Sequence, residues 1–338
     1  MYNLLFSAMH CQVGLSKMKN RDSLLDGLRG LAIVLVVLGH TIQFANGSNY
    51  LASGKYLESL PFKAIYGFHM PLFMSISGLL FGIKNDKNFF PLLTNKFRSL
   101  LVPIFSWSII DYGIRSVVLH TVHSYGALSF AKKIVGTCIY NMWFLWALFY
   151  CVIVAALIGK FSPKRSYLCF AALMALMLIT PDALNFGNYK FMFPYFFTFY
   201  MLGKAGIWSQ LKLLSTSKLL AIFAATFSTY GLAILFWKST YYIYATGVSL
   251  LGKNVLNQFL IDVIRWGTGF FGVISMMIIF LMLDRLYASV WKASYLVSIG
   301  KSSLGIYAIS SVAFLYAIPY VTRSLDFTNQ IVLNCGDI

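Results

Sequence analysis

The first apolar stretch of the chain carries three ionisable side chains on one helical face. Arg29 and His40 are 11 residues apart, which is about 20° beyond three full turns, and Asp26 falls within about 40° of the same line. A rise of about 1.5 Å per residue places His40 roughly 16 Å beyond Arg29 along the helix. Histidine titrates near neutral pH and can act as general base or nucleophile, so an imidazole this deep in an apolar helix predicts a catalytic group.

Each of these three residues also has a structural interpretation. Arg29 could extend to lipid headgroups, Asp26 could cap the start of the helix, and His40 could hydrogen-bond a neighbouring helix. We favour the structural interpretation for Asp26 and Arg29 taken singly. The shared face and the depth of the imidazole favour the functional interpretation for His40.

Two aromatic or imidazole side chains begin later apolar stretches. His69 opens the second stretch, in the segment HMPLFMSISG, and could face the same outer cavity as His40 or lie at the interface without a role. Trp143 opens the fourth, in NMWFLW, and could belong to an interfacial aromatic belt or stack on a sugar. Ser77 and Gly78 predict the close approach of another helix.

Two acid–base pairs lie within apolar stretches at helical spacing. Asp111 and Arg115 are four residues apart, and Asp262 and Arg265 are three apart. At these spacings the two side chains share a helix face, so we expect each pair to neutralise itself.

The elements that must position these residues are membrane helices. The chain has 338 residues, of which 59% are hydrophobic and only 11% charged, with a mean hydropathy of +0.73. This composition argues against a soluble globule, because an average soluble domain is about 25% charged. A spanning helix needs about 20 apolar residues, and the sequence predicts an all-α polytopic membrane protein with about nine such helices, at 27–45, 64–83, 99–119, 138–159, 166–181, 190–208, 218–237, 258–283 and 302–322.

The net charge of +17 reflects the orientation of these helices. On a soluble protein this excess would suggest nucleic acid, but here the basic residues lie in short connectors between apolar stretches. Of the 27 Lys and Arg residues, 17 fall on the side of the N-terminus and 9 on the opposite side. Because Lys and Arg are retained in the cytoplasm, we predict a cytoplasmic N-terminus and no nucleic-acid partner.

The remaining composition predicts a single membrane domain without a bound metal. The five cysteines show no CxxC pair and no zinc-like spacing with histidine, so we interpret them as packing residues. Phosphate-binding glycine loops and the HExxH pattern do not occur. We expect residues 1–20 to be an N-terminal extension with Met18 as an alternative start, residues 21–322 to form the membrane domain, and residues 323–338 to be a short polar tail.

Taken together, these segments resemble the integral-membrane acyltransferase-3 family. The similarity is carried by five segments in order, of which Ser302–Tyr307 is the last, and it is closest to the stand-alone sugar O-acetyltransferases of the fucose 4-O-acetylase type. Where many members have an Arg-x-x-Arg pair, this chain has Asn95 and Arg98. The segments are DGLRG with His40, HMPLF with SG, the basic KFR followed by LLVP, WFL, and SSLGIY.

The resemblance implies a bundle of about ten helices in a bacterial-type cytoplasmic membrane and a defined reaction. Members transfer an acyl group, usually acetyl, from cytoplasmic acyl-CoA to a hydroxyl of a cell-surface or lipid-linked carbohydrate, with acyl-CoA as a co-substrate and no resident cofactor. The family's first-helix residues correspond to Arg29 and His40 as catalytic groups, and its basic residues to Lys96 and Arg98 as acyl-CoA ligands. Asp26, His69 and Trp143 would contact the acceptor.

Two other classes of function stay open on the sequence. A proton-coupled transporter or flippase would use intramembrane Asp–Arg pairs and a midplane histidine as a proton relay. An assembly or sensor protein would need no catalytic group. The acceptor sugar, the position modified, the length of the acyl group and the oligomeric state are not determined by the sequence.

Overall fold

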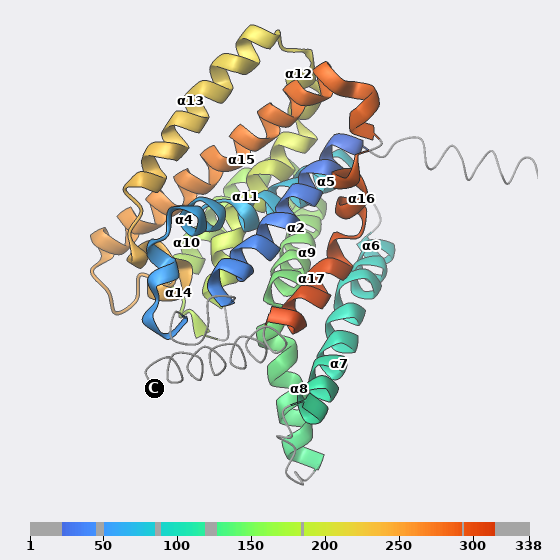
Figure 1. Ribbon diagram of the computed structural model, residues 1–338, viewed down its shortest axis with the longest axis vertical. Helices are drawn as coiled ribbons and strands as arrows, with labels where there is room; N and C mark the ends of the chain where they lie inside the picture. Colours follow the sequence, from blue (N-terminus) through green and yellow to red (C-terminus); the bar gives the residue numbers. More distant parts are fainter. Residues whose placement is uncertain are drawn as a thin grey trace, which may run out of the picture.

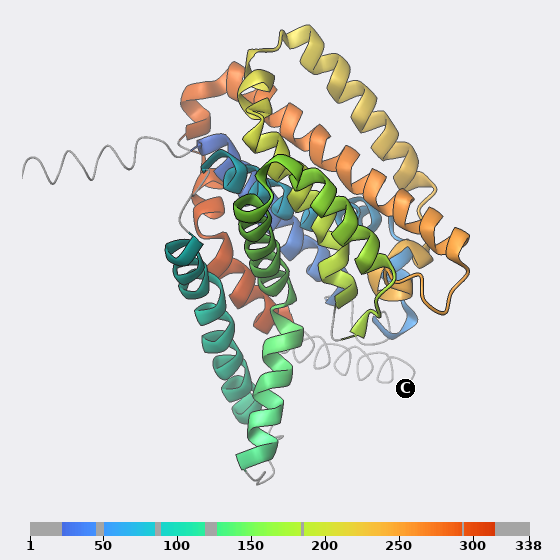
Figure 2. The same ribbon diagram turned by 180° about the vertical axis from the view of Figure 1, so that it is seen from behind.

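The computed structural model describes residues 22–44, 51–84, 89–118, 127–183, 186–292 and 294–314, and within these ranges it is helical and contains no strand (Figures 1 and 2). Residues 1–20, the tail 323–338 and the last eight residues of the predicted helix 302–322 lie outside them. Five helical segments are long and apolar enough to cross a membrane, so the chain is a multi-pass membrane protein: Ser23–Phe44, Leu60–Lys84, Trp143–Phe161, Thr216–Leu235 and Val255–Tyr287.

Every apolar stretch predicted as a span contains helix. The remaining four stretches are helical too, but in the described residues they do not meet the same criterion of length and hydropathy, so a total of nine spans stays a prediction. The longer helices are α2 (Ser23–Phe44), α5 (His69–Lys84), α7 (Val102–Val118), α8 (Ala127–Asn141), α9 (Trp143–Phe161), α10 (Ser166–Leu178), α11 (Phe186–Lys204), α13 (Thr216–Leu235), α15 (Val255–Lys292) and α17 (Ser303–Val312).

Short helices connect these elements and cover the ends of the bundle. They are η1 (Lys55–Glu58), α4 (Leu60–Tyr66), α6 (Phe89–Lys96), η2 (Phe97–Leu101), η3 (Pro163–Arg165), α12 (Ile207–Leu213), η5 (Ser239–Tyr241), α14 (Ile243–Thr246) and α16 (Tyr295–Lys301). The beginning of α2 lies with α12 and α16 at one end of the bundle, and α4 and α14 lie at the other end (Figure 1).

Glycines bring the central helices into backbone contact. A Cβ at Gly78 of α5 would overlap the backbone carbonyl of Phe196 in α11, so α5 and α11 can pack this closely only with glycine there. This confirms the close approach predicted at Ser77 and Gly78. Gly30 of α2 meets the backbone of Leu296 in α16 in the same way. Small residues at such crossings allow van der Waals contact between helices where lipid removes the hydrophobic driving force.

The segment from residue 237 to residue 248, which we call the aromatic loop, lies between α13 and α15. It contains η5 and α14, and its aromatic residues are Trp237, Tyr241, Tyr242 and Tyr244. Trp237 and Tyr242 are buried, whereas Tyr244 is exposed. The loop lies beside α4 at the end of the bundle opposite the start of α2 (Figure 1), where the last turn of α2 also arrives.

Candidate functional site

A cavity of about 340 Å³ lies where the last turn of α2 meets α5, α9, α17 and the aromatic loop. His40, His69 and Trp143, three of the seven candidate residues from the sequence, all line it. They begin or end their helices: His40 is four residues from the end of α2, and His69 and Trp143 are the first residues of α5 and α9. Helix termini therefore bring together residues that lie about a hundred positions apart in the chain.

His69 is held in one tautomer by the backbone. Its ring is buried, and Nδ1 lies 2.8 Å from the carbonyl oxygen of Ile65. A carbonyl can only accept, so Nδ1 carries the proton and donates, and Nε2 of the neutral ring is left as an acceptor. His69 is thus oriented as a proton acceptor or hydrogen-bond acceptor at the wall of the cavity.

His40 has a weaker partner and a more open position. Its Nδ1 lies 3.5 Å from the hydroxyl of Tyr66, which is the long limit of a hydrogen bond, and the Tyr66 hydroxyl donates to Gln43 Oε1 at 3.2 Å. Because the single Tyr66 proton is used on Gln43, the favourable arrangement has His40 donate from Nδ1 to the Tyr66 oxygen. The ring of Phe314 packs against the imidazole with centroids 5.5 Å apart. In both histidines the proton therefore lies on Nδ1, and Nε2 is the basic nitrogen.

Most of the rest of the cavity wall is aromatic, and the sequence pattern did not indicate it. Tyr66 stacks on Phe62 at 3.9 Å and meets His69 edge-on at 4.8 Å. The aromatic loop adds Tyr242, whose hydroxyl donates to the carbonyl of Leu57 at 3.0 Å. The SSLGIY segment supplies Tyr307 from α17. Such walls exclude water and bind the apolar faces of a ligand, while a small number of polar groups fix its orientation.

The aromatic loop is held in shape by one buried guanidinium. Arg265 of α15 donates from Nε to Tyr241 O at 2.7 Å, and from its two terminal nitrogens to Thr240 O, Tyr242 O, Gly247 O and Thr246 Oγ1 at 3.0, 2.9, 2.6 and 2.5 Å. It also pairs with Asp262 at 2.9 Å, with both side chains fully buried. The predicted pairing of Asp262 and Arg265 is confirmed. Its larger role as the template of the loop was missed, because a spacing of three residues shows only the partner within the helix.

The remaining candidates from the sequence lie elsewhere. Asp26 is buried and pairs with Arg29 at 3.7 Å near the start of α2, roughly three turns before His40. Lys96 ends α6, and Arg98 is exposed in the π-helical turn η2 that leads into α7. None of these four residues lines the cavity described above. Their assignment to the reaction stays a prediction.

The carboxylate at the helix start is Asp22 and not Asp26. One oxygen of Asp22 accepts the Leu24 N–H at 3.1 Å, and the other accepts Trp208 Nε1 and Lys212 Nζ at 2.9 and 2.6 Å. Burial raises the pKa of Asp22, but the Lys212 and Trp208 donors outweigh burial and leave this pKa below its usual value. The structural interpretation of Asp26 as a cap is therefore wrong, since α2 begins at Ser23 and places Asp26 inside it.

Other potential ligands for a metal are scattered. In the part of the chain that the structure describes, no three His, Cys, Asp or Glu side chains are grouped to hold an ion. Cys138 and Cys151 are buried and carry no disulfide. The side chain of Arg115 lies outside the described residues, so its predicted pairing with Asp111 stays a prediction.

Comparison with known proteins agrees with the resemblance of the segments. An acyltransferase domain matches residues 22–333. The nodulation protein NolL of Sinorhizobium fredii is 35% identical over 179 residues, which cover 52% of this chain and 47% of NolL, and that of Mesorhizobium japonicum is 30% identical over 187 residues, which cover 54% and 47%. This chain thus spans about half the length of these curated relatives. No solved structure matches it.

Proposed function

Since an acyltransferase domain matches residues 22–333, the chain belongs to the acyltransferase-3 family, and we propose that it moves an acetyl or other acyl group from acyl-CoA to a hydroxyl of a cell-surface or lipid-linked carbohydrate. The family match supports the predicted class of enzyme, an acyltransferase. The observation that carries the proposal is the cavity in which His40 and His69 both present a basic Nε2 within an aromatic wall.

In the proposed reaction, His40 is the general base. Its Nε2 takes the proton from the acceptor hydroxyl while the hydroxyl oxygen attacks the thioester carbonyl. The new carbon–oxygen bond forms, the carbon–sulfur bond breaks, and the thiolate of CoA leaves and recovers the proton from the imidazolium. In the covalent alternative, Nε2 first takes the acyl group and then passes it to the acceptor. His69 holds a neighbouring hydroxyl of the acceptor through Nε2, and Trp143 stacks on the sugar ring.

Donor binding is proposed at the opposite end of α2. Arg29 lies about 16 Å from His40 along the helix, which is about the length of the pantetheine arm of CoA. The phosphates of acyl-CoA would stay in the interface near Arg29, Lys96 and Arg98, because guanidinium and ammonium groups hold phosphates by charge-assisted hydrogen bonds. The thioester would then enter the bundle toward His40. This arrangement requires a cytoplasmic N-terminus and an inner-membrane location.

The test is acyl transfer by purified full-length protein in liposomes, with acetyl-CoA labelled in the acetyl group and surface glycans of the producing cells as acceptors. We expect label on the glycan, and a loss of at least about a hundredfold in rate for His40→Ala, which is the lower range for removal of a general base. Leu38→Ala is the matched control, because Leu38 lies on the same helix, is exposed and does not line the cavity.

Three results would contradict the proposal. Full transfer by His40→Ala at normal protein abundance would exclude His40 as base or acyl carrier. Flux of a solute across the liposome without turnover of acetyl-CoA would favour a transporter or flippase. Neither turnover nor flux would favour an assembly or sensor protein.

A further inference from the structure

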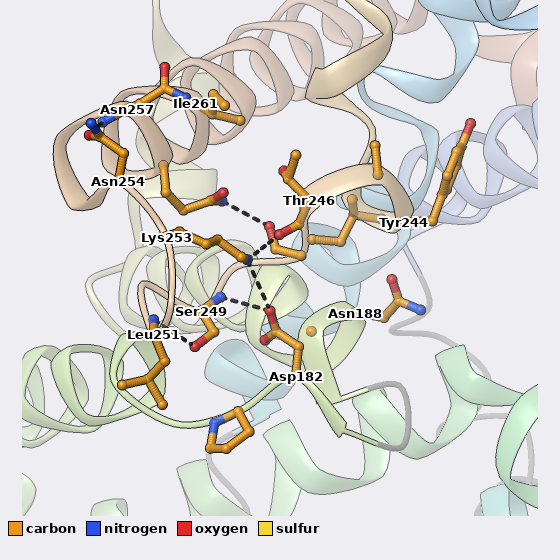
Figure 3. Close-up of a pocket in the computed structure, with 16 residues that line it drawn as sticks. Asp182, Asn188, Tyr244, Thr246, Ser249, Leu251, Lys253, Asn254, Asn257 and Ile261 are labelled. Carbon is orange, nitrogen blue, oxygen red and sulfur yellow. Dashed lines mark hydrogen bonds and ion pairs between the residues drawn. The ribbon is translucent and has the colours of Figure 1, made fainter.

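A second and larger cavity, of about 950 Å³ (Figure 3), adjoins the cavity of His40 and His69, which we call the histidine cavity. Asn188, Ile243 and Tyr244 line both cavities, so the two share a wall. The second one, which we call the polar vestibule, is formed by the segment before α11, the aromatic loop and the start of α15. A ligand that projects out of the histidine cavity past Tyr244 would enter it.

The walls of the polar vestibule are fixed by the partly exposed carboxylate of Asp182 and the buried ammonium of Lys190. Asp182 Oδ2 accepts the N–H groups of Val248 and Ser249, both at 2.8 Å, and Oδ1 accepts Lys190 Nζ at 3.0 Å. Lys190 is fully buried and donates also to the carbonyls of Thr180 and Pro181, at 2.5 and 3.0 Å. These bonds attach the segment before α11 to the end of the aromatic loop. The vestibule is therefore a preformed space and not a gap between independent loops.

Its charged groups are directed at the protein. Burial raises the pKa of the Asp182 carboxyl, but the Ser249 and Val248 N–H groups and the Lys190 ammonium outweigh burial and keep this pKa below its usual value. Lys253 donates to the carbonyl of Thr246 and lies 3.8 Å from Asp182 (Figure 3). An ionic ligand would have to displace these pairs. The chemistry of the walls therefore favours a neutral ligand.

The other groups of the vestibule are those that bind sugar hydroxyls and ring faces. Asn188 and Asn257 supply amides, each with both donors and acceptors. Asn254 Oδ1 accepts the Asn257 N–H at 3.0 Å and caps α15, which leaves the side chain of Asn257 unused by the cap. Tyr244 is 56% exposed and stacks on Tyr242 with centroids 5.4 Å apart, so it offers a supported aromatic face.

We propose that the polar vestibule is a subsite for the part of the acceptor glycan that lies beyond the reacting sugar, so that the acceptor is an oligosaccharide and not a free monosaccharide. This rests on the proposed acyl transfer. The volumes agree with such a division, because small-ligand sites span about 300–1,000 Å³, and the histidine cavity is near the lower limit and the vestibule near the upper one. The shared wall at Asn188 and Tyr244 is where the chain of sugars would pass.

The experiment compares acceptors of different length on the full-length protein. Neutral oligosaccharides released from the surface glycan of the producing cells are separated by length, and each is tested for labelled acetyl transfer and for binding by calorimetry. We expect kcat/KM to rise at least tenfold from the monosaccharide to longer oligosaccharides and then to level off.

Two variants localise the effect. Asn257→Trp adds an indole at the wall of the vestibule while its backbone N–H still reaches Asn254, and Asn257 does not line the histidine cavity. We expect it to lower kcat/KM and affinity for the long acceptors at least tenfold and to leave the monosaccharide within twofold. Gln210→Trp is the matched control, because Gln210 is exposed on α12 at the other end of the bundle.

The outcomes separate this inference from the proposed function. Length-independent transfer and binding, or equal losses for short and long acceptors in Asn257→Trp, would overturn the subsite. If no glycan is acetylated but long oligosaccharides bind more tightly than short ones and Asn257→Trp abolishes the difference, the acyl transfer fails and the subsite stands. Absence of both transfer and binding would overturn both.

Discussion

Replacement of Arg265 by lysine should release the aromatic loop while keeping the positive charge. The guanidinium of Arg265 reaches six acceptors, five of which are in the loop and the sixth on Asp262. An ammonium has three donors, so at least three acceptors lose their partner. At about 1–1.5 kcal/mol for each lost bond, the loop contacts weaken by about 3–4.5 kcal/mol. Opening of the loop should then become at least about a hundredfold more frequent, because 1.4 kcal/mol is a factor of ten.

Hydrogen exchange of the loop amides measures this opening. Tyr241, Ala245 and Gly247 donate their N–H groups within the loop, so their exchange reports its opening. Arg285→Lys is the matched control, because Arg285 lies on the same helix and binds the carbonyls of Lys212 and Leu214 far from the loop.

The result that refutes the reasoning is specific. If Arg265→Lys is folded and its loop amides exchange within threefold of the wild-type rate, Arg265 does not hold the loop. If Arg265→Lys does not fold, Asp262→Asn tests the complementary expectation, because the amide that replaces the carboxylate still offers an oxygen to Arg265 and the five loop bonds remain. We then expect less than tenfold faster exchange, and a larger change than that would place the main contribution on Asp262.

Three further predictions concern stability and the acceptor. The pKa of Asp182 is depressed in the folded protein, so its charged form stabilises the fold above the usual carboxyl pKa of about 4. This contribution is lost as the pH falls through the lower folded pKa. The unfolding free energy should therefore fall more steeply with decreasing pH for wild type than for Asp182→Asn, as measured by acid unfolding. Gly78→Ala should lower the unfolding free energy by about 1–3 kcal/mol in thermal or denaturant unfolding because its Cβ overlaps Phe196, whereas Gly231→Ala, where a Cβ meets nothing within 4 Å, should not destabilise. His69→Asn keeps a donor near the position of Nδ1 and should fold normally. Because it loses the proposed Nε2 contact to the acceptor, kcat/KM for the acceptor should fall about tenfold, and KM for acetyl-CoA should be unchanged. An unchanged acceptor kcat/KM would show that the role of His69 is structural alone.

The helical part of this fold could be predicted from sequence because hydropathy reports it directly. Apolar stretches of about 20 residues have few stable alternatives in lipid, and each predicted stretch does contain helix. The helix starting near residue 190 was displaced, since α11 begins at Phe186 and buries Lys190 within its first turns. A lysine normally marks a boundary, but here two backbone carbonyls and Asp182 satisfy it inside the protein.

The site was predicted only in part. His40 was recognised because an imidazole deep in an apolar helix is unusual, whereas His69 and Trp143 each had an interfacial interpretation as well. The structure places all three on one cavity. The aromatic loop and the polar vestibule were not found, because Tyr and Asn in a connector have no periodicity, and the contacts that shape them come from Asp182 and Arg265, which are distant in the chain. Only a three-dimensional arrangement shows that the loop's carbonyls converge on one guanidinium.

The positions of charge along α2 indicate how one helix could serve both substrates. The paired Asp26 and Arg29 lie in its first turns and His40 in its last, on one face, and the described cavities adjoin only the His40 end. A helix of 22 residues is about 33 Å long, close to the hydrocarbon thickness of a bilayer. An anionic donor is therefore expected at one surface and a neutral, hydroxyl-rich acceptor at the other, with the imidazole on the acceptor side. With the donor bound at the Arg29 end as proposed, we expect the thioester to cross most of the bundle to react, so that the narrow arm of CoA, and not the acceptor, enters the apolar core.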